Sequence, residues 1–327
     1  MKIAVISPLF SRSSELRSAL NAFCADVIYN DDNRLKTKED IINFLRDADA
    51  AIVGREMIDD EILSHCPRLQ MLSRYGVGLD NLDLEAMKQR NIALGWSGGT
   101  NANSVAEITL GFMLSLMRNL HRSTSKMKQG IWKVNGGREL SGKTIGLFGF
   151  GHISKRLIEL LQPFHCTILV YNRTHDEDEA KRYGITFATK ERIIAECDIL
   201  SIHLPLTSET HGMFSTKEFI EMKKEAFIIN TARGDIIDEA ALKIALSSGE
   251  IAGAALEAFS VEPVEDKELI ALENLICTPH LGGNSYESIL NMGFSCIEHL
   301  KEFYKSTNKK RAKALFIILH SRRNNQL

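Results

Sequence analysis

The chain has 327 residues, of which 44% are hydrophobic and 25% are charged, a composition typical of globular proteins. This length can bury a large core and indicates about two domains, which argues against a disordered chain. The 40 Lys and Arg residues nearly balance the 42 Asp and Glu residues, so net charge gives no reason to expect nucleic acid or an acidic membrane as the main partner.

The first strands and helices alternate from the start of the chain. Apolar runs predict strands at 2–7, 27–30, 50–53 and 70–73, separated by helical patterns at 14–23, 38–46 and 59–64. A second set of strands is predicted at 144–148, 167–171, 199–203, 226–230, 252–256 and 275–277. Strand and helix in alternation predict an α/β fold with two Rossmann-like parallel sheets, the first flavodoxin-like and the second dinucleotide-binding.

A glycine-rich loop follows the predicted strand at 144–148 and precedes a helical pattern at 155–161. Strand, glycine turn and helix in this order supply backbone N–H groups and a helix N-terminus for a pyrophosphate. A serine stands where the third glycine of such a loop is usual, and its small side chain still permits close packing of helix on strand. The loop is Gly149, Phe150, Gly151, His152, Ile153 and Ser154.

The position of this loop indicates an inserted cofactor domain, because about 100 residues of a separate α/β unit precede it. We expect residues 1–98 to form a substrate-binding domain that is completed by 284–327, of which about 284–304 is helical. Residues 99–283 form the NAD(P)-binding domain in this interpretation. The reaction is then expected in a cleft between the two domains.

The end of the strand at 167–171 bears on the choice between NAD and NADP. An NAD site usually places Asp or Glu here, where the carboxylate binds the ribose hydroxyls and repels a 2′-phosphate. This chain has Asn172, Arg173 and Thr174 instead, which remove the repulsion and offer a planar fork and a hydroxyl to a phosphate. We favour NADP over NAD; the alternative is that Arg173 stacks on the adenine.

Three further side chains have the chemistry for hydride exchange with a 2-hydroxy acid. Arg233 follows a strand, and its guanidinium can bind a substrate carboxylate in bidentate fashion, although it could equally form a structural salt bridge. His280 also follows a strand and can donate a proton to the developing alkoxide, with Glu262 bonding its other ring nitrogen. A solitary loop histidine is more often structural, so the prediction depends on the three residues together.

Several motifs resemble those of the D-isomer-specific 2-hydroxyacid dehydrogenases, from residue 55 to about residue 292. These are Gly142-Lys143-Thr144 with the glycine loop, the run 203–207, the turn 230–234, the run 253–256 and Thr278-Pro279-His280. The resemblance implies that Arg233, Glu262 and His280 are the catalytic trio. It also implies substrate contacts at Arg55, Tyr75, Gly76, Val77 and Gly78, and further cofactor contacts at Leu204, Pro205, Thr231, Ala232, Glu257, Gly282 and Gly283.

One of these cofactor positions departs from the family pattern. Family members usually have Asp where Glu257 stands, and that Asp holds the carboxamide of the nicotinamide. The resemblance further implies a homodimer, to which the helix entered through Asn101 and Asn103 contributes. A regulatory domain like that of longer phosphoglycerate dehydrogenases is not expected in the remaining residues.

The predicted function is therefore NAD(P)-dependent dehydrogenation of a D-2-hydroxy acid, most like that of phosphoglycerate dehydrogenase. Arg55, Arg74 and Lys133 are candidates to bind a substrate phosphate. One alternative is an NADP-dependent glyoxylate or hydroxypyruvate reductase. Another, from a different class, is a cofactor-sensing binding protein similar to the corepressors that resemble this family. Formate dehydrogenase fits less well, since its chemistry needs no proton donor.

The cysteines and the chain ends complete the prediction. The six cysteines show no short spacing and lie in or near apolar stretches, which predicts free thiols in a reducing cytoplasm and no metal site. We find neither a signal peptide nor an apolar run of the ~20 residues that span a bilayer, so we expect a soluble protein. The basic run at 301–323 is usually a solvated tail, and we assign it no nucleic-acid role.

Overall fold

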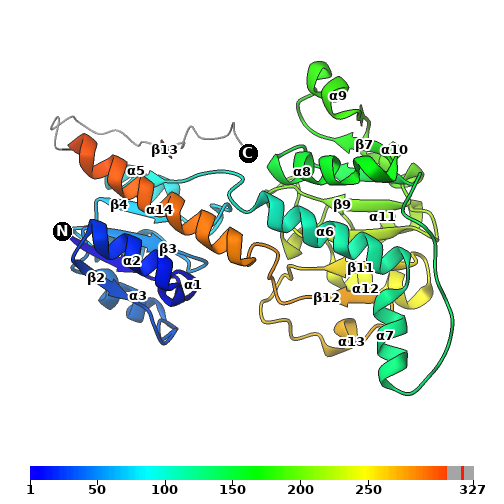
Figure 1. Cartoon of the computed structure of the whole chain (residues 1–327), viewed down its shortest axis with the longest axis horizontal. Coiled ribbons are helices and arrows are strands. Elements are labelled where there is room, and N and C mark those ends of the chain that lie inside the picture. Colours follow the sequence, from blue (N-terminus) through cyan, green and yellow to red (C-terminus); the bar gives the residue numbers. More distant parts are fainter. Residues whose placement is uncertain (308–317, 320–327) are drawn as a thin grey trace. The chain divides into compact units, whose positions relative to one another are not determined.

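The computed structural model describes residues 1–307 and 318–319, and the chain forms two compact units. Unit 1 comprises Met1–Asn101 with Gly283–Leu327, and unit 2 comprises Ala102–Gly282. These boundaries lie three residues after and one residue before those expected from the sequence. The roles given to the two units, and a cleft between them, stay predictions. Figure 1 shows the helices and strands of each unit.

Unit 1 is built on a six-stranded parallel sheet in the order β13-β5-β4-β3-β1-β2. Its first five strands have the order 2-1-3-4-5 of flavodoxin-like sheets, as predicted. The strands are β1 (Lys2–Val5), β2 (Asp26–Tyr29), β3 (Ala50–Val53), β4 (Met71–Arg74), β5 (Ala93–Gly95) and β13 (Ile318–Leu319). The helices are α1 (Pro8–Arg12), α2 (Ser14–Phe23), α3 (Lys38–Leu45), α4 (Asp60–Ser64), α5 (Leu84–Gln89) and α14 (Tyr286–Thr307).

Helix starts in unit 1 follow from local chemistry. Ser13, Thr37 and Asp59 stand just before α2, α3 and α4, and each side chain accepts a hydrogen bond from an N–H group of the first turn. The late helix α14 returns to this unit and packs on its sheet beside α2 (Figure 1). Its buried residues Met292, Cys296 and Leu300 share one apolar cluster with the sheet. Burial of this face is what joins the end of the chain to its beginning.

Unit 2 is built on a seven-stranded parallel sheet in the order β12-β11-β10-β9-β6-β7-β8. The strands are β6 (Thr144–Phe148), β7 (Thr167–Tyr171), β8 (Thr186–Phe187), β9 (Ile199–Ile202), β10 (Phe227–Asn230), β11 (Gly253–Leu256) and β12 (Leu275–Cys277). The helices are α6 (Ala102–Met117), α7 (Leu120–Lys128), α8 (His152–Leu161), α9 (Glu177–Tyr183), α10 (Lys190–Glu196), α11 (Thr216–Glu221), α12 (Glu239–Ser248) and α13 (Lys267–Ile270), with short 3-10 turns at Gln162–Phe164 and Gly234–Ile236.

Two apolar clusters cover the two faces of this sheet. Helices α6 and α8 contribute to the cluster on one face, and α10, α11 and α12 contribute to the cluster on the other. Strands β9, β10 and β11 are buried along their whole length, which explains why they read as continuous apolar runs rather than alternating ones. The prediction of two α/β parallel-sheet domains is confirmed.

The predicted strands and helices agree with the observed ones to within three residues at each end. Strands β5, β8 and β13 were not predicted, because two or three residues are too few to show a period. All six cysteines are free, as predicted. None of the helices in the described residues is long and apolar enough to cross a membrane. Most of the basic run at 301–323 lies outside the described residues.

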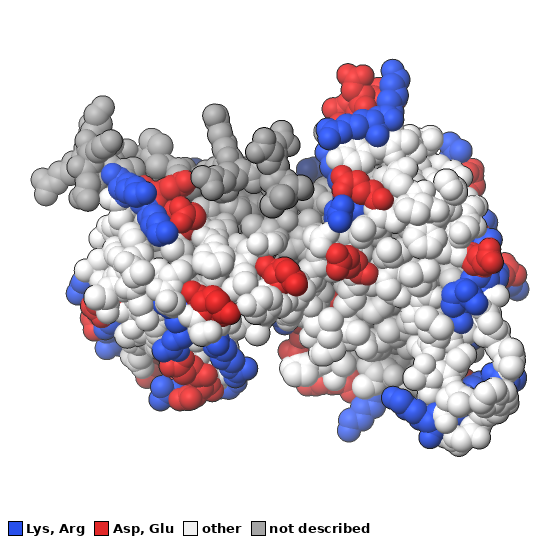
Figure 2. Space-filling model, viewed as in Figure 1, with Lys and Arg blue, Asp and Glu red and all other residues white. Residues whose placement is uncertain are grey.

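Charged side chains of both signs are interspersed on the face of the molecule drawn in Figure 2. Charged side chains of the described residues also form ion pairs, for example Lys38 with Asp59 at 2.7 Å and Lys190 with Glu218 at 2.8 Å. On this face no large field of a single sign is present among the described residues. This agrees with the near balance of charge in the sequence.

A buried histidine holds α14 to the strands of unit 1. His299 has no exposed surface, and its Nδ1 and Nε2 atoms lie 3.3 and 2.9 Å from the hydroxyls of Ser73 and Ser97. Ser295, also on α14, donates to the Ser97 hydroxyl at 2.9 Å. Burial lowers the pKa of His299 from its ordinary value of 6.5 to about 4. The neutral imidazole is therefore the form that the folded protein favours.

This histidine should make unit 1 acid-sensitive. Because the unfolded chain binds a proton near pH 6.5 and the folded protein only near pH 4, the contribution of His299 is complete above about pH 6.5 and is lost as the pH falls toward 4. The loss is on the order of 3 kcal/mol. Urea unfolding between pH 4.5 and 7 should show a shallower dependence of the unfolding free energy on pH in His299→Gln. Leu300→Ala, which removes no titrating group, should keep the wild-type slope; an unchanged slope in His299→Gln would contradict the assignment.

Candidate active site

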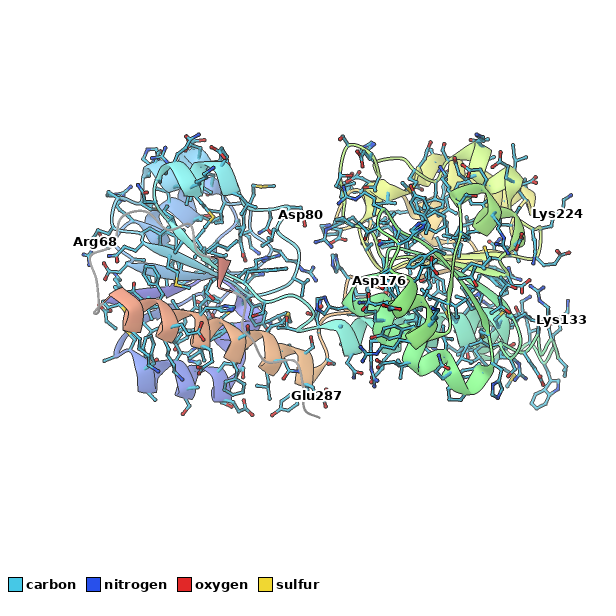
Figure 3. All side chains as sticks on the ribbon, turned by 90° about the horizontal axis from the view of Figure 1, so that it is seen from above. Arg68, Asp80, Lys133, Asp176, Lys224 and Glu287 are labelled. Carbon is cyan, nitrogen blue, oxygen red and sulfur yellow. The ribbon has the colours of Figure 1, made fainter. Side chains whose placement is uncertain are left out.

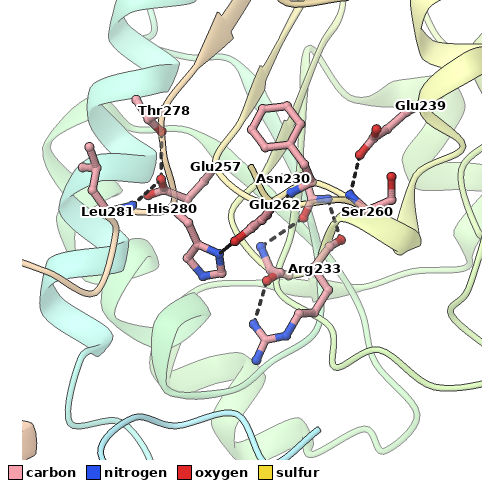
Figure 4. Close-up of polar contacts among 11 residues, drawn as sticks. Asn230, Arg233, Glu239, Glu257, Ser260, Glu262, Thr278, His280 and Leu281 are labelled. Atoms are coloured by element: carbon pink, nitrogen blue, oxygen red, sulfur yellow. Dashed lines mark hydrogen bonds and ion pairs between the residues drawn. The ribbon is translucent and has the colours of Figure 1, made fainter. Parts of the chain in front are cut away.

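The pairing of three neighbouring strands determines which side chains meet in unit 2. Asn230 at the end of β10 is paired with Leu256 at the end of β11, and Leu256 is paired with Cys277 at the end of β12. The three following segments, 231–234, 257–262 and 278–282, therefore leave the sheet at the same edge. Residues about 50 positions apart in sequence are brought together at the carboxyl ends of parallel strands, where ligands bind in such sheets (Figure 4).

His280 and Glu262 form a direct pair. His280 Nδ1 lies 2.8 and 2.9 Å from the two carboxylate oxygens of Glu262, and Glu262 Oε1 also accepts the backbone N–H of Phe259 at 3.1 Å. Both side chains are about one-third exposed. A proton on Nδ1 is donated to the carboxylate, so Nε2 is the nitrogen that can exchange a proton with a ligand. The pairing of Glu262 with His280 that the sequence suggested is present in the structure.

Arg233 lies in the neighbouring turn. The Asn230 side chain fixes this turn, because its amide donates to the carbonyl of Arg233 at 2.8 Å and its oxygen accepts the N–H of Ala232 at 3.0 Å. A Cβ atom on Gly234 would lie 2.0 Å from the carbonyl carbon of Phe259, so only glycine lets the turn lie against the segment that carries Glu262. Figure 4 shows Arg233 near the His280–Glu262 pair.

Glu257 is almost completely buried at the end of β11, with 2% of its surface exposed. Its Oε1 atom accepts from the hydroxyl of Thr278 at 2.8 Å and from the N–H of Leu281 at 2.7 Å. Its Oε2 atom is buried and has no hydrogen-bond partner in the described part of the chain. A buried carboxylate oxygen is stable only with a donor, so this atom is suited to accept a hydrogen bond from a ligand.

The glycine loop has two glycines with different roles. Gly149 has φ +101°, and a Cβ atom there would lie 2.6 Å from the carbonyl oxygen of His203, so the protein itself requires glycine. Gly151 is extended, and a Cβ atom there would meet nothing within 4 Å. Gly151 also precedes α8, whose first turn has no side-chain cap, so the N–H groups at the start of this helix are not occupied by a capping side chain.

Ser154 replaces the third glycine of the loop without disturbing it. The side chain is fully buried, and its hydroxyl donates to the carbonyl of Gly149 at 2.8 Å. The serine therefore adds a hydrogen bond across the turn, which the sequence did not reveal.

The segment after β7 is ordered by two contacts. The Asn172 amide donates to both the carbonyl and the hydroxyl of Thr174, at 2.7 and 3.1 Å. The ring of His175 stacks on Phe187, with centroids 4.6 Å apart and planes 4° apart. His175 was not singled out from the sequence. Its position directly after Thr174 was the one signal that could have linked it to this segment. Leu204 and Pro205 follow β9, which ends at the same edge of the sheet.

The predicted substrate residues of unit 1 lie after β3 and β4. Arg74 is 8% exposed, and its guanidinium donates to the carbonyls of Gly78, at 2.6 Å, and of Gly54. Trp96 donates to the carbonyl of Val77 at 2.8 Å. These contacts turn the carbonyls of the loop 75–78 toward the protein, and no acceptor for the N–H groups of residues 76–78 is found in the described residues.

The three residues predicted as candidates to bind a substrate phosphate have different surroundings in the structure. Arg74 bonds backbone carbonyls, whereas Lys133 is exposed at the outer margin of unit 2 (Figure 3). Arg55 follows β3 in unit 1. Among the described residues, no group of three or more His, Cys, Asp or Glu side chains is arranged to hold a metal ion.

Comparison with known protein families shows which family the chain resembles. Residues 110–282, more than half of the chain, match the NAD-binding domain of the D-isomer-specific 2-hydroxyacid dehydrogenases. The chain belongs to this family. Within it, the chain is 34% identical over 270 residues to a D-3-phosphoglycerate dehydrogenase of Methanocaldococcus jannaschii, which covers 81% of this chain and 52% of that protein. It is 32% identical over 275 residues to a glyoxylate reductase of Thermococcus litoralis, which covers 81% of this chain and 83% of that protein.

Solved structures of other proteins have the same fold as this chain. An acyclic imino acid reductase in complex with NADPH and D-Arg superimposes with a TM-score of 0.84 and 26% identity, over 94% of this chain and 98% of that chain. The chain spans about half the length of the phosphoglycerate dehydrogenases that it matches.

The two loop glycines allow a test of the nucleotide site in this family member. Gly151→Ala should fold with an unfolding free energy within about 1 kcal/mol of the wild type, because its Cβ meets no protein atom. Its affinity for a nicotinamide dinucleotide, measured by fluorescence titration, should fall at least about tenfold, because the methyl group occupies space that the phosphates need. Gly111→Ala in α6 also meets nothing within 4 Å and is the matched control. Unchanged affinity in Gly151→Ala would place the dinucleotide elsewhere.

Proposed function

We propose that this protein is an NAD(P)-dependent D-2-hydroxyacid dehydrogenase. The observation that carries the proposal is the His280–Glu262 pair at 2.8 Å, held beside Arg233 at the carboxyl edge of a nucleotide-binding sheet. A pair of this kind supplies and recovers a proton, which reduction of a 2-keto acid requires. The names of the relatives, phosphoglycerate dehydrogenase, glyoxylate reductase and hydroxypyruvate reductase, support the same reaction class.

The proposed mechanism uses each member of the trio differently. Arg233 binds the substrate carboxylate through its guanidinium and polarises the neighbouring C2 carbonyl. His280 Nε2 gives a proton to the C2 oxygen as a hydride reaches C2, and it takes that proton back in the oxidation. Glu262 keeps the Nδ1 proton in place and stabilises the imidazolium form. When bound, the nicotinamide supplies or accepts the hydride.

Several residues of unit 2 fit the cofactor. The loop 149–153 offers N–H groups and the start of α8 to the pyrophosphate. We propose that Glu257 Oε2, which is buried and has no hydrogen-bond partner in the described residues, accepts a hydrogen bond from the carboxamide of the nicotinamide. Leu204 and Pro205 follow β9, Thr231 and Ala232 follow β10, and Gly282 follows β12, at the same edge of the sheet, and we propose that they contact the cofactor. Gly283, the last proposed contact, begins the second segment of unit 1.

The cofactor is proposed to be NADP rather than NAD. The Asn172 amide donates to the Thr174 hydroxyl oxygen, which leaves the hydrogen of that hydroxyl to be donated to another group. A 2′-phosphate would accept this hydrogen bond and a fork from Arg173, and no carboxylate stands at position 172 to repel it. The structural relative bound to NADPH is consistent with this choice.

The substrate is proposed to be a small 2-keto or 2-hydroxy acid that also contacts Arg55 and the N–H groups of residues 76–78. The N–H of Tyr75 donates to the carbonyl of Val53 at 2.9 Å, so the backbone of Tyr75 is not proposed as a donor. 3-Phosphoglycerate is the first candidate, by similarity to the phosphoglycerate dehydrogenases. The contacts of Arg74 favour glyoxylate or hydroxypyruvate as the second candidate, because this guanidinium is bound to carbonyls rather than presented to a phosphate.

A homodimer is proposed from exposed apolar side chains on and after α7. Trp132 and Val134 are 82% and 87% exposed, and Leu120, Met127 and Ile131 are about half exposed. Such a group is suited to a second copy of the chain. The molar mass of the wild type and of Trp132→Glu in solution tests this, because a monomeric wild type would exclude it.

Initial rates with four 2-keto acids and both cofactors test the proposed function. Phosphohydroxypyruvate, hydroxypyruvate, glyoxylate and pyruvate should be tried with NADPH and NADH in parallel, and we expect turnover of at least one acid, faster with NADPH. His280→Ala should lower kcat by about 100- to 10,000-fold, because the proton donor is lost. Glu262→Gln, which keeps the shape and loses the charge, should lower kcat less.

Three outcomes would count against parts of the proposal. Turnover that survives intact in His280→Ala would exclude the mechanism. A strong preference for NADH would overturn the role given to Arg173. Binding of a protein partner with no turnover on any 2-keto acid would favour the cofactor-sensing alternative, as found in the corepressors that resemble this family.

A further inference from the structure

We infer that Glu257 is a positioning residue that fixes the pose of His280, in addition to its proposed contact with the cofactor. This inference rests on the proposed function, since it gives His280 its catalytic role. The structural basis is a contact set that we call the Glu257 clamp, formed by Glu257, Thr278 and Leu281 (Figure 4).

The Glu257 clamp forms hydrogen bonds to the chain on both sides of His280. One oxygen of Glu257 accepts from the Thr278 side chain, two residues before the histidine, and from the Leu281 N–H, one residue after it. Both hydrogen bonds are short, at 2.8 and 2.7 Å, and the carboxylate that accepts them is 2% exposed. Hydrogen bonds to a buried carboxylate are among the stronger ones in proteins.

The backbone of His280 needs such an anchor. Its φ is +50°, in the left-handed region that residues other than glycine rarely adopt because of the strain on the backbone. A residue stays in this region only when its surroundings hold it there. The Glu262 carboxylate holds the ring of His280, whereas the Glu257 clamp holds the backbone that carries the ring.

The length of the Glu257 side chain allows its second hydrogen bond, the one from the N–H of Leu281. Thr278 donates its backbone N–H to Leu256, so it stands next to Glu257 at the edge of the sheet, whereas Leu281 is three residues farther along the loop. A Cβ atom on Gly282 would lie 2.6 Å from Glu257 Oε2, so a glycine there leaves room for the longer acid. Aspartate, the usual family residue, is one methylene shorter and would give up one of the two contacts.

The two oxygens of Glu257 therefore have separate tasks. Oε1 is engaged by the loop that carries His280, and Oε2 is buried without a partner in the described residues, ready for a ligand donor. Because one rigid carboxylate carries both contacts, a group bound at Oε2 is held in fixed relation to the histidine. The clamp thus aligns the proton donor with the bound nicotinamide.

The double-mutant cycle of Thr278→Val with His280→Ala tests the clamp. Thr278→Val removes one hydrogen bond to Glu257 and keeps the shape of the side chain. At saturating cofactor, it should lower kcat about tenfold while the Kd for NADPH changes less than about twofold. In the His280→Ala background it should cause no further loss, because it acts through the histidine. Thr278→Ser should restore the wild-type rate, and Thr167→Val, on an exposed threonine at the opposite end of β7, is the matched control.

A second readout does not depend on turnover. The imidazole ring signals of His280 in an NMR spectrum, assigned by their loss in His280→Ala, should move in Thr278→Val and in Glu257→Asp, but not in Thr167→Val. Additive losses of kcat in the cycle, or unmoved ring signals, would overturn the inference and leave the proposed function intact. Full activity of His280→Ala would instead remove the proposed function.

Discussion

The in-register pairing of β10, β11 and β12 is the constraint on which the site depends. Because Asn230, Leu256 and Cys277 stand side by side, the three loops that follow them start from one edge of the sheet. The pairing is set by backbone hydrogen bonds and by burial on both faces of β10 and β11, so a slip of one residue would turn buried side chains to the wrong face. This register is why the segments that carry Arg233, Glu262 and His280 all start at one edge of the sheet.

Two carboxylates, one buried and one about one-third exposed, then position His280 at this edge of the sheet. Glu262 orients the imidazole ring, and Glu257 holds the loop that carries it. Gly234 contributes by the absence of a side chain, since any Cβ would press on the backbone at Phe259. The site is thus assembled from three strand ends, two acids and one glycine. The relatives of this chain bear the names of enzymes for different acids, phosphoglycerate, glyoxylate and hydroxypyruvate.

Much of this arrangement could be predicted from the sequence, because apolar runs and glycine turns report local structure directly. The strands of unit 2, the glycine loop and the pairing of Glu262 with His280 were all expected. The contacts of Arg74 were not, since nothing in the sequence tells that its guanidinium is turned to carbonyls at Gly54 and Gly78. The partners of Glu257 were also missed, because a side-chain contact across a loop depends on φ at His280, which composition does not encode.

Transfer of isotope from the cofactor to the substrate tests the central claim most directly. Reduction of a substituted 2-keto acid, such as hydroxypyruvate, with a reduced nicotinamide cofactor in which both hydrogens at C4 of the ring are deuterium should place one deuterium at C2 of the product, and the product should have the D configuration. Hydrogen from the solvent should appear only on the C2 oxygen, as expected if His280 supplies a proton and the cofactor a hydride. A product without deuterium at C2, or one of L configuration, would contradict the account.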